Sequence, residues 1–231
     1  MPYRSSMPRS SLLGAALLCL SVILPACRPV PVRATESAAL PPEPAPVGVA
    51  ASTDTAVFAG GCFWGVEAVF EHLNGVSTAI SGFAGGKVRS PSYEEVSTGT
   101  TGHAESVLVV YDPSRISYDQ LLQVFFTVAH DPTQLDRQGP DVGSQYRSVV
   151  FYRTDAQRDA ARRYIAKLES AKTYGRPIVT EVVPLDRFNE AEAYHQDYLA
   201  HHPHQPYIVI NDAPKLVALA RAFPSLYADK R

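Results

Sequence analysis

One nine-residue stretch decides how this chain folds: Ala59-Gly60-Gly61-Cys62-Phe63-Trp64-Gly65-Val66-Glu67. The apolar, β-branched run before it, residues 55–59, predicts a short strand, which the two glycines end. Beyond Cys62, apolar residues recur at helical spacing from Val66 to Leu73. The stretch therefore predicts a strand, a glycine turn and a helix, with Cys62 at the N-terminus of the helix.

The position of Cys62 favours a reactive thiol. Free backbone N–H groups and the helix dipole at a helix N-terminus stabilise a thiolate relative to a thiol. Gly60 and Gly61 would let a substrate approach the backbone closely, and Phe63 and Trp64 are placed to form the wall of an apolar pocket. The alternative is a small buried cysteine between two core aromatic residues, which is the commoner role of a lone cysteine.

Composition excludes several classes of protein. The chain has 231 residues and a net charge of −2, so it has neither a basic footprint for nucleic acid nor an acidic tail. Its length suits one good-sized core or two small ones. The three cysteines are Cys19, Cys27 and Cys62. A low, odd number argues against a disulfide scaffold.

Residues 1–27 have the pattern of a signal peptide. Two arginines precede an apolar run at 11–24, which has the length of a signal-peptide core and is too short for a membrane span. The run ends in Leu24-Pro25-Ala26-Cys27, which resembles a bacterial lipoprotein cleavage box with Cys27 as the lipidated first residue. Ordinary cleavage after Ala34 and a retained membrane anchor are the alternatives. All three predict export, so we expect a periplasmic protein, with a lipid anchor if Cys27 is acylated.

Residues 28–54 predict a linker, because proline and alanine dominate them and such a segment is extended and packs poorly. The catalytic domain is expected to span residues 55–231. Strands are predicted at 55–59, 76–84, 103–111, 146–152 and 177–185, and helices at 62–74, 117–128, 155–172, 189–201 and 215–222. The order β-α-β-β-α-β predicts an α/β (α+β) two-layer sandwich with a mixed sheet and a split-βαβ, ferredoxin-like core, plus extra helices. Two long polar loops, 87–102 and 130–145, are the kind that often carry function.

Glu105 is the best candidate for an acid that assists the thiol. It stands at the entry to a very apolar strand, in Gly102-His103-Ala104-Glu105. A carboxyl in such surroundings has a raised pKa and stays protonated. The alternative is that Glu105 points outward to solvent, since the side chains of a strand alternate between its two faces.

Four further polar residues are candidates. Tyr93 and Tyr146 each adjoin a long loop, where a phenol could donate a hydrogen bond to a developing oxyanion, or simply pack. Asp141 lies in a glycine- and proline-rich turn and could be a turn residue and nothing more. His195 lies on the predicted helix 189–201, where a lone histidine is commonly structural or solvated.

Three histidines near the end of that helix, His201, His202 and His204, raise the question of a metal site. Their neighbourhood lacks the further cysteines or paired carboxylates that would complete one. A solvated helix end is therefore the favoured interpretation, and no metal is expected.

Together these segments resemble a known family. The motifs, in order, are Gly61-Cys62-Phe63-Trp64-Gly65, Gly82-Phe83-Ala84-Gly85-Gly86, Thr101-Gly102-His103-Ala104-Glu105, His130-Asp131-Pro132, Gln145-Tyr146-Arg147-Ser148 and Ala193-Tyr194-His195-Gln196. From about Ala56 to Leu216 the chain is similar to the type A peptide methionine sulfoxide reductases. Phe83 stands where the family often has tyrosine.

The resemblance implies a mechanism. Cys62 would attack the sulfur of an S-epimer methionine sulfoxide, in proteins and as the free amino acid, and become a sulfenic acid. Glu105 would protonate the sulfoxide oxygen. The resemblance assigns the other roles as follows: hydrogen bonds to that oxygen from Tyr93 and Tyr146, a pocket for the methyl group from Phe63 and Trp64, and a supporting polar network that includes Asp141 and His195, with Gly61 part of the cysteine motif. No metal or organic cofactor is implied.

One departure from the family concerns the reductant. Many relatives carry a resolving cysteine just after the catalytic one or near the C-terminus, but here Gly65 follows Trp64 and no cysteine follows Cys62. The chain is therefore expected to be a one-cysteine enzyme whose sulfenic acid is reduced by an external thiol, either a thioredoxin-like protein or a small thiol. Its substrates would be oxidised proteins that carry methionine sulfoxide.

Three alternatives remain open. A one-cysteine thiol peroxidase would also pass through a sulfenic acid, although the Phe63–Trp64 pair suits a thioether methyl better than hydrogen peroxide. A cysteine hydrolase would need a histidine base, for which His195 is available. From another class, the domain could be an exported binding module in which Cys62 is inert.

Overall fold

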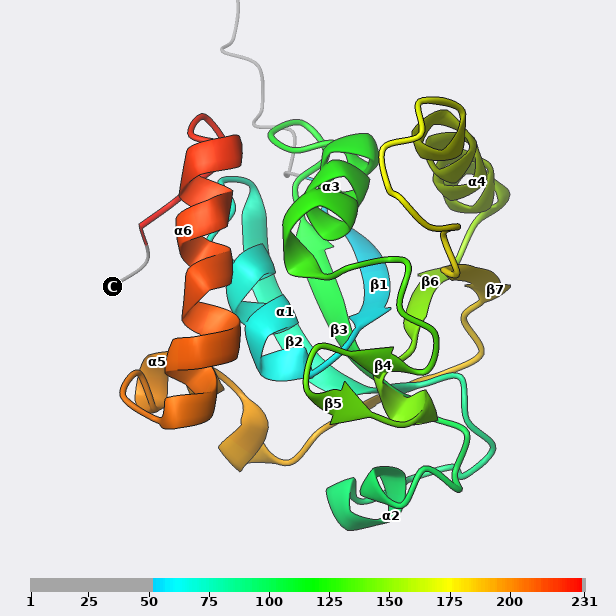
Figure 1. Ribbon diagram of the computed structural model, residues 1–231, viewed down its shortest axis with the longest axis vertical. Coiled ribbons are helices and arrows are strands. Elements are labelled where there is room, and N and C mark those ends of the chain that lie inside the picture. Colours follow the sequence, from blue (N-terminus) through cyan, green and yellow to red (C-terminus); the bar gives the residue numbers. More distant parts are fainter. Residues whose placement is uncertain (1–51, 230–231) are drawn as a thin grey trace, which may run out of the picture. The chain divides into compact units, whose positions relative to one another are not determined.

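The computed structural model describes residues 52–229 (Figure 1). The predicted signal peptide, the lipoprotein box with Cys27 and almost all of the predicted linker lie outside the described residues.

The main sheet contains β1 (Asp54–Gly60), β2 (Val76–Ala84), β3 (Ala104–Tyr111), β6 (Ser148–Tyr152), β7 (Glu181–Pro184) and β8 (Phe188–Glu190), and a separate hairpin contains β4 (Arg137–Gln138) and β5 (Asp141–Val142). The α-helices are α1 (Phe63–Glu71), α2 (Tyr93–Ser97), α3 (Tyr118–Val124), α4 (Asp155–Ser170), α5 (Tyr198–His201) and α6 (Ala213–Ala222). Shorter 3₁₀ turns are η2 (Ser144–Tyr146) and η3 (Ala193–His195), and π-helical turns are η1 (Phe125–Ala129) and η4 (Ile208–Asp212).

The strand order of the main sheet confirms the predicted split-βαβ fold. The order is β7-β6-β1-β3-β2-β8. Strands β1 and β2 are joined through α1 and have β3 between them, antiparallel to both, while β6 pairs antiparallel with the other side of β1. Strand β7 adds to β6 in parallel, which makes the sheet mixed. The topology therefore puts the end of β1, and with it the turn to α1, in the middle of the sheet.

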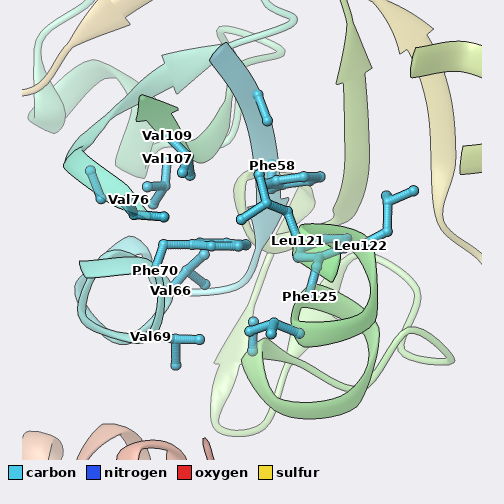
Figure 2. Close-up of a cluster of buried hydrophobic side chains, with 14 of the residues drawn as sticks. Phe58, Val66, Val69, Phe70, Val76, Val107, Val109, Leu121, Leu122 and Phe125 are labelled. Atoms are coloured by element: carbon cyan, nitrogen blue, oxygen red, sulfur yellow. The ribbon is translucent and has the colours of Figure 1, made fainter. Parts of the chain in front are cut away.

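The larger core lies between one face of the sheet and the helices α1, α3 and α4 (Figure 2). The ring of Phe58 on β1 stacks on Phe70 of α1 at 5.1 Å and on Phe125 at 4.8 Å, between ring centroids. Val66 and Val69 complete the buried face of α1, because residues three and four apart share one side of a helix. This packing fixes the direction of α1, and therefore the position of its first turn.

The opposite face of the sheet carries a smaller apolar cluster. Its buried members include Val57, Val149 and Phe151, and Val183 and Phe188 pack against them. Within residues 52–229, no helix is both long enough and apolar enough to cross a membrane. The described fold is thus a sheet with helices on one face and mainly chain segments on the other.

The predicted helix 189–201 is wrong. Strand β8 occupies its start and pairs with β2, and the backbone of Ala191 donates to the carbonyl of Ser81. The side-chain amide of Gln196 then donates to the carbonyl of Ser81 and accepts from its N–H. Asp197 adopts a left-handed conformation with φ 53°, so only the short helix α5 follows it. These contacts with the sheet edge outweigh the local helical pattern.

Two other segments differ in detail. The predicted strand 177–185 is regular only over Glu181–Pro184. The predicted loop 87–102 contains helix α2, which begins with a capping box: the hydroxyl of Ser92 accepts from the N–H of Glu95, and the carboxylate of Glu95 accepts from the N–H of Ser92.

Candidate active site

Cys62 occupies the position directly before α1, as the sequence predicts. Its backbone is extended, with φ −53° and ψ 122°, so Cys62 is the N-cap residue. Gly61 has φ +94°, and a Cβ at this position would lie 2.5 Å from the side chain of Gln138. A Cβ at Gly60 would lie 3.0 Å from His130. The two glycines therefore let the protein's own side chains pack against the turn, which differs from the expected approach of substrate to the backbone.

The thiol of Cys62 is buried, with 8% of the residue exposed. Burial raises the pKa of this thiol well above its ordinary value, and the nearby carboxyls of Glu105 and Asp212 raise it further. The N–H of Trp64 and the ammonium of Lys215 act in the opposite direction. Loss of hydration and the two carboxyls thus raise the pKa of this thiol and oppose the stabilisation of the thiolate that the helix N-terminus predicts.

Glu105 lies beside this thiol and points into the protein, with 3% of the residue exposed. Its Oε2 accepts a hydrogen bond from the N–H of Phe63, the first residue of α1, at 3.0 Å. Burial raises the pKa of Glu105 from 4.5 to about 8, although the bond from Phe63 lowers it, and the acids Asp141 and Asp212 add to the rise. Near neutral pH the structure thus holds a protonated carboxyl next to the sulfur.

Tyr93 and Tyr146 come from the two long loops and face the same centre. Tyr93 is the first residue of α2, and Tyr146 is the last residue of η2. Burial raises the pKa of both phenols; Glu105 is the next cause in each case, and Cys62 contributes to both. Both hydroxyls therefore remain protonated donors close to the thiol and the carboxyl.

An aromatic group lines the other side of the site. The ring of Phe63 lies 5.1 Å from that of His195, and Trp64 stacks on Tyr198 with ring centroids 3.7 Å apart. The indole N–H of Trp64 donates to Nδ1 of His195 at 3.1 Å. Burial lowers the pKa of His195, which favours the neutral ring that this bond requires. His195 is thus a partner of Trp64 and does not act as a base for the thiol in this geometry.

Three residues of the site were not found from the sequence: Tyr207, Asp212 and Lys215. Together with Cys62 they line a cavity of about 110 Å³, whose remaining walls are Gln138, Gly139, Pro140, Asp141 and Asn211. The hydroxyl of Tyr207 donates to Oδ2 of Asp141 at 2.5 Å. Lys215 Nζ donates to Oδ1 of Asp212 at 3.1 Å. Asp141, which the sequence suggested could be only a turn residue, therefore lies in the wall of this cavity.

A larger cavity, of about 570 Å³, lies away from the thiol, between the loop after β2 and strand β7. Its lining includes Arg147 and Glu181, which form an ion pair at 3.6 Å, and no cysteine. His201, His202 and His204 are exposed. In the described part of the chain, no group of three histidine, cysteine or carboxylate residues is arranged to hold a metal ion.

The arrangement defines a class of enzyme site: a buried cysteine thiol with a protonated carboxyl and two phenols next to it, and aromatic rings that form the other wall. A cysteine hydrolase needs a histidine within hydrogen-bond distance of the sulfur, and the described bond of His195 is to Trp64. A buried carboxyl and two phenols are instead groups that can supply a proton and hydrogen bonds to an oxygen atom.

Comparison with known proteins identifies the family. Residues 54–225 match the family model "Peptide methionine sulfoxide reductase". A peptide methionine sulfoxide reductase of Mesorhizobium japonicum is 55% identical over 181 residues, which is 78% of this chain and 93% of that protein. The corresponding protein of Natronomonas pharaonis is 52% identical over 171 residues, 74% of this chain and 96% of that one. The chain belongs to the peptide methionine sulfoxide reductase family, which is a family of oxidoreductases.

Solved structures agree with this assignment. The reduced form of Mxr1 from Saccharomyces cerevisiae is similar with a TM-score of 0.63 and 35% identity, over 68% of this chain and 89% of that one. Methionine sulfoxide reductase A of Corynebacterium diphtheriae gives a TM-score of 0.59 and 38% identity, over 67% and 78% of the two chains. The fold and the family are therefore the ones that the sequence motifs predicted.

Proposed function

We propose that this protein reduces the S epimer of methionine sulfoxide to methionine, in oxidised proteins and as the free amino acid, with Cys62 as the nucleophile and Glu105 as the acid. The observation that carries the proposal is the buried carboxyl of Glu105, which accepts the N–H of Phe63 directly after Cys62, the only thiol of the described residues, and whose raised pKa favours its protonated form. Family membership supplies the substrate class.

The chemical step balances with these two residues. The sulfur of Cys62 attacks the sulfoxide sulfur while Glu105 transfers its proton to the sulfoxide oxygen. The hydroxyl then moves from the substrate sulfur to the sulfur of Cys62: the sulfur–oxygen bond of the substrate and the new sulfur–sulfur bond break, a sulfur–oxygen bond to Cys62 forms, and methionine leaves with Cys62 as a sulfenic acid. The proton of the thiol replaces the one that Glu105 gave. The substrate sulfur gains two electrons and Cys62 loses two. Hydrogen bonds from Tyr93 and Tyr146 would stabilise the charge that develops on the oxygen.

The aromatic residues suit the other end of the substrate. Phe63 is fully buried and Trp64 is half-buried and stacked on Tyr198, so both rings are held in place. An apolar, rigid wall of this kind favours a thioether methyl group over a small polar oxidant such as hydrogen peroxide. This feature favours a sulfoxide reductase over a thiol peroxidase.

An external thiol would complete the cycle. No cysteine follows Cys62 in the sequence, and position 65, next to the site, is a glycine over which Asp212 and Lys215 are packed. We propose that a thioredoxin-like protein or a small thiol attacks the sulfenic acid, releases water and forms a mixed disulfide with Cys62. A second thiol of the reductant then breaks that disulfide and restores Cys62.

The proposal is tested with free methionine sulfoxide and dithiothreitol. The wild-type protein should convert the S epimer and leave the R epimer unchanged, and Cys62→Ser should form no methionine. Without any reductant, one equivalent of methionine per protein is expected, followed by trapping of the sulfenic acid by dimedone on the Cys62 peptide. Methionine formation that survives Cys62→Ser would refute the proposal, and so would equal activity on both epimers. Faster consumption of hydrogen peroxide than of sulfoxide would favour the peroxidase alternative.

We also propose that the protein is exported to the periplasm and lipidated at Cys27, which supports a repair role outside the cytoplasm. The support is the sequence of residues 1–27, which lie outside the described residues. Mass spectrometry of the protein purified from membranes should give a mature N-terminus at an acylated Cys27. An unmodified N-terminus after Ala34 would refute lipidation while leaving export intact.

A further inference from the structure

Asp212 and Lys215 lie where the π-helical turn η4 passes directly into α6. The backbone is helical without a break from residue 206 into α6, so Asp212 does not cap a free helix end. Turns of the π type are frequent at functional sites, and this one brings the two charged side chains to the cavity that Cys62 lines.

The pair that they form lies against the first turn of α1. Lys215 Nζ is 3.1 Å from Oδ1 of Asp212, and only 1% of the Asp212 side chain and 18% of the Lys215 side chain are exposed. A Cβ at Gly65 would lie 2.0 Å from Oδ1 of Asp212 and 2.7 Å from Nζ of Lys215. Glycine inside a helix is destabilising relative to alanine. Here it leaves the space that the ion pair occupies, three residues from Cys62.

Among the charged groups of the described residues that face Cys62, Lys215 is the only cation. In the described part of the chain, the groups that face the thiol are Glu105 from β3, Asp141 from β5, Tyr93 from α2, Tyr146 from η2, Tyr207 before η4, and Asp212 and Lys215 at the start of α6. All of these except Lys215 are acids. His130 does not supply a second cation, because burial lowers its pKa to about 4.

We infer that Lys215, held by Asp212 in the space left open by Gly65, is the counter-ion that stabilises the negatively charged sulfur of Cys62. Lys215 and Asp212 are positioning residues. The charge of Lys215 stabilises the thiolate of Cys62 in a buried site rich in acids, and the charge of Asp212 weakens this stabilisation. The inference rests on Cys62 acting as the nucleophile of the proposed function, but it concerns the charge of the sulfur and not the identity of the substrate.

Substitution of Lys215 and of Asp212 should shift the pKa of the Cys62 thiol in opposite directions. Removing the ammonium of Lys215 leaves the sulfur among acids and makes the thiolate harder to form. Removing the charge of Asp212 while keeping its shape, as in Asp212→Asn, leaves Oδ1 available to Lys215 and takes away one of the negative charges that disfavour the thiolate. A role limited to packing would give loss of function for both substitutions and would not reverse its sign.

The test is the rate of alkylation of Cys62 by iodoacetamide between pH 6 and 10, followed by mass spectrometry of the Cys62 peptide so that Cys19 and Cys27 do not interfere. Iodoacetamide is uncharged, so its approach does not depend on Lys215. At pH 7.5 we expect Lys215→Met to be about tenfold slower than wild type, with its pH curve displaced to higher pH, as for loss of one nearby charge in a partly screened site. Lys215→Arg should stay within about twofold, and Asp212→Asn should be faster, with its curve displaced to lower pH.

Gly65→Ala supplies the control for location. If the pair acts from the space over Gly65, the added methyl group displaces it, and Lys215→Met should then have little further effect in the Gly65→Ala background. A pH curve of Lys215→Met that coincides with the wild-type curve would overturn the inference. So would a uniform slowing at all pH values with no displacement, because that is the result of altered access. Wild-type protein that alkylates as expected but reduces no sulfoxide would refute the proposed function and leave the counter-ion role standing.

Discussion

The sharpest consequence of the structure concerns Glu105→Gln. Glutamine keeps the shape of the side chain and retains an oxygen that can accept the hydrogen bond of the Phe63 N–H, which is 3.0 Å from Oε2 in the native protein. What it removes is the proton that the carboxyl can give. The substitution therefore separates acid catalysis from the placement of α1.

The magnitude follows from the raised pKa. A carboxyl with a pKa of about 8 is about 90% protonated at pH 7, whereas one with the ordinary value of 4.5 is only about 0.3% protonated. General acid catalysis contributes about 10²- to 10⁴-fold. The variant still offers an N–H hydrogen bond to the oxygen, so we expect kcat/KM for methionine sulfoxide to fall by about 10²- to 10³-fold at pH 7.

The pH dependence of the turnover rate provides a second test, because its direction follows from the raised pKa of Glu105. With Glu105 as the proposed acid, the wild-type rate should decline as the pH rises through about 8, and this decline should be absent in Glu105→Gln. Alkylation of Cys62 should be no slower in the variant, because Glu105 is one of the groups that raise the pKa of the thiol. The matched control is Glu67→Gln, which changes another carboxyl with 1% exposure and a pKa of about 8. Glu67 bonds to the backbone of Ser81, so this control should retain wild-type turnover.

Steady-state rates of methionine formation between pH 6 and 9.5, with dithiothreitol in excess, provide the measurement. Rates of Glu105→Gln within about tenfold of wild type would contradict the assignment of the acid. Persistence of the decline near pH 8 in the variant would assign that decline to another group. Loss of turnover in both glutamine variants would show that the effect is structural.

Four other outcomes are expected. Cys62→Ser should abolish methionine formation and leave the thermal unfolding transition nearly unchanged, which differential scanning calorimetry checks. Glu67→Gln should flatten the dependence of the unfolding free energy on pH between 4.5 and 8: the folded state raises the pKa of Glu67, so stability is highest below 4.5 and falls as the pH rises, by up to about 1.4 kcal/mol per pH unit. Phe58→Ala, at the centre of the stacked rings, should reduce the unfolding free energy in urea by about 3–5 kcal/mol, and a loss under 1 kcal/mol would contradict the described core. Tyr207→Phe removes the bond to Asp141 and should lower kcat/KM by less than Glu105→Gln does, with thermal stability retained; equal activity would place this bond outside the reaction.

The strand, turn and helix around Cys62 were predictable because each depends on local pattern. Residues 55–59 show little alternation of polar and apolar side chains, as in a buried strand, and two glycines end this run. The spacing of apolar residues from Val66 onward fits one face of a helix. Helix α2 was also within reach of the sequence, since Ser92 and Glu95 have the spacing of a capping box. The assignment of residues 87–102 to a loop overlooked that signal.

The remaining parts of the site depend on long-range contacts. Gln196 bonds to Ser81, 115 positions earlier in the chain, and this contact holds residues 189–197 against the edge of β2 instead of in a helix. No local signal specifies such a pairing. Likewise, nothing in the sequence near Tyr207 indicates a bond to Asp141.

The raised pKa values of Cys62 and Glu105 have one common consequence for the chemistry. Burial is the main cause that raises the pKa of both groups and favours their protonated forms at neutral pH. A protonated thiol is a poor nucleophile toward peroxides, since the thiolate is the reactive form. In the proposed reaction a sulfoxide changes this balance, because its oxygen takes the proton of Glu105 while its sulfur takes the electrons of Cys62. The site thus couples formation of the thiolate to delivery of a proton, and this coupling favours a substrate that presents a basic oxygen bonded to an electrophilic sulfur.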